Sequence, residues 1–175
     1  MMTVIHIMDD QDELQIGFSD IEKYHGRLAL MAVAVAFRAQ QAAFKELFGD
    51  RVPQRKEIKI ISGHAGPGFR DSFEFVTRAL TRGQYTVDVQ YPQGQYDPHR
   101  PQAYAFVIST LAGDAVEVVL KESFLPAVFY DYLKKGREGT MTDAEQEQFR
   151  QLKLSLSEQA LALPQDELLD VRRIS

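Results

Sequence analysis

The chain has 175 residues, 45% of them apolar and 26% charged, so it is long enough and apolar enough to bury a core. A formal net charge of −5 argues against nucleic acid as a partner, because phosphate backbones bind basic surfaces. The absence of cysteine excludes disulfides, cysteine-ligated zinc, iron–sulfur clusters and a thiol nucleophile. We therefore expect a cytoplasmic protein in which any bound metal ion is held by His, Asp or Glu.

Residues 1–18 form an acidic N-terminal segment. They contain no Lys or Arg and lack the positive and apolar regions of an export signal. The longest apolar run, Leu28–Phe37, has ten residues, whereas a membrane helix needs about 20. The sequence therefore predicts no membrane partner.

The first predicted helix begins at Ser19, which with Glu22 has the spacing of a capping box. Apolar residues then recur every three or four positions as far as Leu47, and Gly49 is placed to end the helix. Its middle, Leu28–Phe37, is apolar on nearly all sides. We expect that part to be enclosed by a sheet or by a second copy of the chain.

A strand at Glu57–Ser62, a glycine loop and a helix from Phe69 or Arg70 to Arg82 follow. Three further strands rich in β-branched and aromatic residues are predicted at 84–91, 103–111 and 115–120. A turn at Gly113-Asp114 joins the last two strands. This succession predicts an α+β fold of order α-β-α-β-β-β, with a mostly antiparallel mixed sheet.

Two C-terminal helices complete the prediction. One runs from Pro126 to about Lys135, and the other runs from Asp143 to about Leu161 after a capping box of Thr142 and Glu145. The second helix would pack either on its own domain or on a second copy of the chain. The chain thus divides into the acidic segment 1–18, an α+β core at 19–122 and a helical extension at 123–175.

The glycine loop is the first candidate site. Gly63, Gly66 and Gly68 permit backbone conformations closed to other residues, and the helix that follows presents free N–H groups. These three glycines, with Arg70 and Asp71, are the candidate ligand-binding residues for a small ligand, an anion or a metal. The spacing matches neither a Walker A loop nor the dinucleotide fingerprint, so ATP and NAD are not predicted. The alternative is a tight strand-to-helix turn without a ligand.

His25 and His64 are the candidate metal ligands. If the first helix packs over the strand that ends at Ser62, the two imidazoles would converge near Asp71. Two histidines and one carboxylate can hold a divalent transition metal with open coordination positions.

Several of these motifs occur together in one known family. Tyr24-His25-Gly26-Arg27, the glycine loop with Arg70-Asp71, and Thr77-Arg78-Ala79 resemble the FmdE-like family, the E component of formylmethanofuran dehydrogenase. The likeness covers about Ser19–Leu120 and is stronger to the family's divergent bacterial, cysteine-free branch. The resemblance implies an α+β fold, a small anionic or pterin-like ligand, and a link to one-carbon metabolism or to molybdenum and tungsten enzymes.

The family's first motif, Phe-His-Gly-His-x-Cys-Pro-Gly, offers His and Cys as metal ligands. In this chain Arg27, Ala29 and Leu30 stand where the motif has its second His, its Cys and its Pro. The resemblance therefore carries over only His25 and, in the divergent branch, His64.

The connection Pro92–Gln102 holds three prolines and is a candidate lid, because loops of this length inside a domain are often functional. The alternative is an ordinary surface loop. Asp97 and His99 in this loop are the candidates to replace the missing cysteine ligand.

Three hypotheses of function follow. The preferred one is an accessory protein whose pocket, between the first helix and Gly63–Gly68, binds a small ligand, an anion or a metal. The second is a His-ligated, metal-dependent enzyme at the same place. The third is a homodimeric interaction module without a ligand, built on the apolar first helix and the tail helix.

Overall fold

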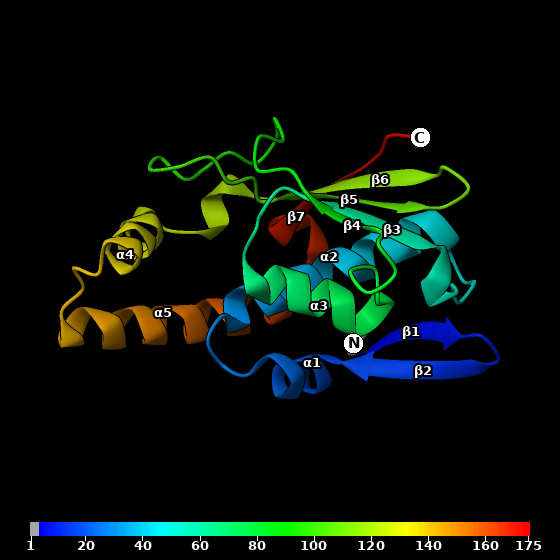
Figure 1. Cartoon of the computed structure of the whole chain (residues 1–175), viewed down its shortest axis with the longest axis horizontal. Coiled ribbons are helices and arrows are strands. Elements are labelled where there is room, and N and C mark those ends of the chain that lie inside the picture. Colours follow the sequence, from blue (N-terminus) through cyan, green and yellow to red (C-terminus); the bar gives the residue numbers. More distant parts are fainter. Residues whose placement is uncertain (1–3) are drawn as a thin grey trace.

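The computed structural model describes residues 4–175 and begins with a β-hairpin that the sequence did not predict (Figure 1). Strand β1 (Val4–Asp9) pairs antiparallel with β2 (Asp12–Gly17). Ile5, Ile7 and Ile16 are buried on the inner face of this hairpin. The alternation of isoleucine with polar residues was the available signal for two strands, and the acidic residues gather at the exposed turn.

The single first helix predicted from Ser19 is wrong, because the structure divides it at Gly26. Helix α1 is Phe18–His25 and α2 is Leu30–Phe48. Gly26 has φ +91° and ψ −162°, a conformation that is essentially restricted to glycine. The predicted capping box at Ser19 is also wrong, since the Gly17 N–H donates instead to the Asp20 carboxylate at 2.8 Å.

The main sheet confirms the α+β prediction. Its strand order is β4-β3-β5-β6-β7, with β3 and β4 parallel and every other neighbouring pair antiparallel. The strands are β3 (Ile58–Ser62), β4 (Tyr85–Val87), β5 (Ala105–Thr110), β6 (Ala115–Leu120) and β7 (Leu169–Arg173). Strand β4 is shorter than the predicted 84–91, and β7 was not predicted.

Helices cover one face of this sheet. Helix α2 lies against β5, β6 and β7, and α3 (Pro67–Thr77) lies beside it (Figure 1). The apolar stretch of α2 is buried almost without interruption, as predicted, and its neighbours are the sheet, α3 and α5 of the same chain. Helix α3 ends earlier than predicted, because Arg78 takes the left-handed conformation at φ +57°.

The C-terminal extension packs on its own domain. Helix α5 (Asp143–Ala162) lies along α2, and α4 (Ala127–Glu138) leads into it. The chain then passes through α6 (Gln165–Leu168) into β7, and short 3-10 helices occupy Arg55–Glu57 and Glu122–Phe124. In the described part of the chain, no helix combines the length and apolar character needed to cross a membrane.

The capping box at the start of α5 is confirmed and gives a first prediction. Thr142 Oγ1 accepts from the Glu145 N–H at 3.1 Å, and the Thr142 N–H donates to Glu145 Oε1 at 3.0 Å. Thr142→Ala is expected to lower the free energy of unfolding by about 1 kcal/mol, because a helix N–H then loses its acceptor. Urea denaturation measures the loss, with the exposed Thr140→Ala as control. Equal stability of the two variants would contradict the role of the cap.

Candidate functional site

Helix α3 separates the two candidate histidines. Phe69 and Asp71 of this helix are two positions apart and therefore lie on opposite faces of it. The Phe69 ring faces the sheet and lies 5.3 Å from the ring of Phe106. Asp71 faces α1, where its carboxylate contacts His25. His64 lies on the sheet side, against Phe69. Within residues 4–175, no contact joins the two imidazoles.

On the α1 side, His25 and Asp71 form a tightly held pair. Asp71 Oδ2 is 2.8 Å from His25 Nδ1, and the Arg70 Nε–H donates to Asp71 Oδ1 at 3.1 Å. The His25 side chain is 4% exposed. Its other nitrogen, Nε2, is buried and has no hydrogen-bond partner in the described part of the chain. The pair therefore fixes the ring and leaves Nε2 as a buried nitrogen without a partner among the described residues.

On the sheet side, His64 is built into the core. Its Nδ1 accepts from the Gly66 N–H at 2.8 Å, and its ring centroid lies 4.8 Å from those of both Phe69 and Tyr104. Burial, together with the nearby Arg100 guanidinium, lowers the pKa of His64 to about 3. At neutral pH the ring is therefore uncharged, and its proton is on Nε2.

The prediction of a metal site with two histidines and a carboxylate does not match this arrangement. Among residues 4–175, no group of three or more His, Cys, Asp or Glu side chains could hold a metal ion. His25 keeps Asp71 as a partner of its own ring, and His64 uses Nδ1 within the loop.

The backbone N–H groups of the glycine loop are already hydrogen-bonded within the protein. The N–H groups of four successive residues donate to acceptors within the protein, at distances of 2.8 to 3.2 Å: Gly63 to Ala105 O, His64 to Ser62 Oγ, Ala65 to Gln102 Oε1, and Gly66 to His64 Nδ1. Pro67, the next residue, has no N–H to offer. An anion would therefore have to be bound by side chains or by the first turn of α3.

The glycines of the loop serve close packing, and they do not use the positive-φ conformations that glycine permits. None of Gly63, Gly66 and Gly68 is among the described residues with positive φ. A Cβ on Gly63 would lie 2.4 Å from the Cβ of Ala103, and one on Gly68 would lie 2.7 Å from the carbonyl oxygen of Ala29. These glycines let β3 approach the chain before β5, and let α3 approach α2.

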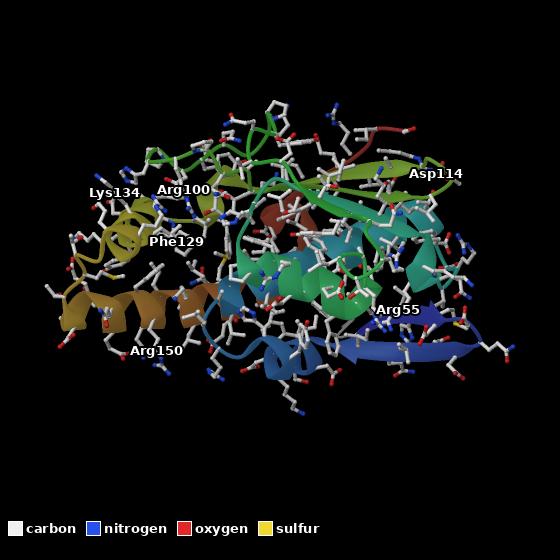
Figure 2. The ribbon with its side chains drawn as sticks, in the orientation of Figure 1. Arg55, Arg100, Asp114, Phe129, Lys134 and Arg150 are labelled. Atoms are coloured by element: carbon white, nitrogen blue, oxygen red, sulfur yellow. The ribbon has the colours of Figure 1, made fainter. Side chains whose placement is uncertain are left out.

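A second polar cluster, missed by the sequence analysis, lies where the loop Pro92–Gln102 meets α4. The hydroxyls of Tyr104 and Tyr130 are buried without partners in the described chain, and their rings are 6.1 Å apart. Asp97 Oδ2 is likewise buried, with Arg100 Nε as its loose neighbour at 4.0 Å. Burial raises the pKa of both phenols, and the Asp97 carboxylate adds to this effect. Figure 2 shows Arg100 at the same end of the molecule as α4.

The structure places the two loop residues Asp97 and His99 differently. Asp97 points inward and accepts from the His99 N–H at 2.8 Å, whereas the His99 ring contacts the exposed Asp131 of α4 at 2.9 Å. The loop itself is tied to the sheet, since the Tyr96 hydroxyl donates to Leu120 O at 2.7 Å. No local sequence pattern predicts this cluster, because its members come from three separate segments.

The comparisons with known proteins add no family. No protein-family model matches the chain, and no curated protein matches it either.

Proposed function

We propose that the chain is an accessory protein that binds a small ligand through His25, at the interface between α1 and α3. The observation that carries this proposal is the His25–Asp71 pair at 2.8 Å, which leaves Nε2 buried and without a partner in the described chain. An unpaired buried polar atom costs about 1–3 kcal/mol. A ligand atom bonded to Nε2 would offset that cost.

The chemistry of the pair suggests the kind of ligand. When Nδ1 donates to Asp71, Nε2 of the neutral ring is an acceptor, so the ligand would present an N–H or O–H group. Arg70 contacts Asp71 through Nε alone, and the rest of its guanidinium can donate to an anion or a carbonyl. A small anionic or pterin-like molecule, as the resemblance to the FmdE-like family implies, has both features.

A His-ligated metal-dependent enzyme is the second candidate. One observation favours it: histidines that bind metal commonly donate their other ring nitrogen to a carboxylate, as His25 does to Asp71. Since the described residues supply no set of three donors, we derive no reaction step through a metal ion.

We also propose that the protein is a homodimer and that it is cytoplasmic. Tyr24 and Leu28 flank His25 and are 54% and 72% exposed. Exposed apolar residues beside a candidate site support a homodimer that covers them. The lack of cysteine supports a cytoplasmic location, and the motif resemblance supports a role beside one-carbon or molybdenum and tungsten enzymes.

The test is calorimetric titration of the full chain, purified without a chelator or a histidine tag, with three probes: Zn²⁺, pterin and inorganic phosphate. We expect one probe to bind with a single site, and His25→Ala to weaken it at least about tenfold, which corresponds to about 1.4 kcal/mol. His99→Ala, which removes an exposed histidine, is the matched control and should leave binding unchanged.

The outcomes separate the candidates. Pterin or phosphate binding that depends on His25 supports the accessory protein. Zn²⁺ binding that depends on His25 moves the metal-dependent enzyme to the front. If every probe binds the wild type and His25→Ala equally, or if none binds, the proposed site is rejected.

A further inference from the structure

A groove of about 870 Å³ lies away from His25, between the N-terminal hairpin, α2 and the end of α5. This volume is within the range of pockets that hold small molecules. Most of its surface is apolar, and rings from two elements form its floor: Phe18 of α1, with Phe37 and Phe44 of α2. The rings of Phe18 and Phe37 pack nearly at right angles with centroids 6.3 Å apart, so α1 and α2 form this floor together.

Cations line one side of this groove. Arg38 and Lys45 lie two turns apart on the same face of α2, each directly after one of the floor phenylalanines. Neither side chain forms an ion pair with any of residues 4–175. The other lining bases do have partners: Arg51 pairs with Glu57, and His6 pairs with Glu13. Among the described lining residues, Asp50 is the one acid.

Arg38 shows why an anion would be favoured here. The side chain is half-buried, and burial alone lowers the pKa of its guanidinium. One of its N–H groups donates to the carbonyl oxygen of Ala160, in the last turn of α5, at 2.6 Å. A carbonyl oxygen carries only a partial charge, so the guanidinium is partly removed from water without a full counter-charge. An anionic group in the groove would supply that charge.

We propose that this groove binds an amphiphile that has an apolar chain and one anionic head. The chain would lie on Phe37 and Phe44, and the head, a carboxylate or a phosphate, would lie between Arg38 and Lys45. An uncharged apolar molecule would supply no negative charge to either cation, and a cationic amphiphile would be repelled by them. The site is separate from His25, so it does not depend on the function proposed above.

The test compares ligands that share one chain and differ in the head. The full chain is titrated calorimetrically with decanoate, decyl phosphate and decanol. We expect both anions to bind about tenfold more tightly than decanol, because only they pair with the cations. Whichever of the two anions binds more tightly shows whether the groove prefers a carboxylate or a phosphate head.

Three variants locate the binding. Lys45→Glu should weaken decanoate at least about tenfold and leave decanol unchanged, since the Lys45 side chain makes no ion pair with the described residues that would support the fold. Ala162→Trp should fill the groove and weaken all three ligands. Lys134→Glu changes the net charge by the same amount as Lys45→Glu, but it lies on α4, away from the groove, and should have no effect. Arg38 is kept intact, because its bond to Ala160 holds α5.

Several results overturn the proposal. Equal affinity for decanoate and decanol removes the role of the cations. Decanoate binding that survives both Lys45→Glu and Ala162→Trp places the ligand elsewhere. The absence of saturable decanoate binding up to its solubility limit, as when a second copy of the chain covers the groove, also rejects the site.

Discussion

Through His64, the wild type is expected to lose about 2 kcal/mol of its free energy of unfolding between pH 7 and pH 5, and His64→Asn is expected to abolish this loss. The pKa of His64 in the folded chain is about 3, well below the ordinary value of 6.5, because the ring is buried. Between these two values the unfolded chain binds a proton that the folded chain does not. Stability from this group is therefore present in full above pH 6.5 and is lost as the pH falls towards 3.

Asparagine suits this test because its side-chain oxygen can accept from the Gly66 N–H, as His64 Nδ1 does, yet it does not titrate. Urea denaturation at pH 7 and pH 5 gives the free energy of unfolding of each protein. The buried, non-titrating Val76→Ala is the control and should lose the same amount as the wild type between the two pH values. A wild-type pH dependence retained in His64→Asn would show that His64 is not held neutral in the fold.

Gly63→Ala is expected to lower the free energy of unfolding by about 3 kcal/mol. The added Cβ would lie 2.4 Å from the Cβ of Ala103, 2.8 Å from the Ala103 carbonyl oxygen and 3.0 Å from that of Ala105. Two of these three atoms belong to the backbone. Because the Gly63 N–H also donates to Ala105 O at 2.8 Å, the segment cannot move away without losing a sheet hydrogen bond.

Thermal or urea denaturation measures this loss, and Gly136→Ala in α4 is the matched control. A Cβ on Gly136 would meet only the flexible end of Met141 at 3.3 Å, and alanine favours a helix more than glycine does. The control should therefore be neutral or stabilising. A Gly63→Ala variant as stable as the control would mean that the strand tolerates a side chain at this position.

The α+β order could be predicted because the sheet core and the helices repeat with clear periods. The segment 105–110 and the apolar run of α2 are buried as their patterns indicate. The β1–β2 hairpin was missed although its isoleucines alternate with polar residues, whereas β7 was missed because it has only five residues, three of them charged. Strand β7 forms through its pairing with β6, where Leu169 lies opposite Leu120. That is a distant contact which no local pattern contains.

The candidate site could be predicted in part. The sequence placed His25, Arg70 and Asp71 in one region, and the structure brings these three together. The prediction failed for His64, which lies in the loop before α3. The path of the chain before Pro67 decides on which side of α3 this residue lies, and the sequence does not show that path. The cluster around Tyr104 and Tyr130 needed the tertiary fold, since Tyr104 directly precedes β5, Tyr130 lies in α4, and Asp97 lies in the loop Pro92–Gln102.

The pairing of β6 with β7 also bears on how the chain folds. The two strands are neighbours in the sheet, yet α4, α5 and α6 lie between them in the sequence. Closing so long a loop costs conformational entropy before the strands can pair. This long-range contact raises the contact order and slows folding. Docking of α5 on α2 shortens the search by holding the end of that loop beside the sheet. We therefore expect the last strand and the last long helix to unfold together, so that loosening either would release the other.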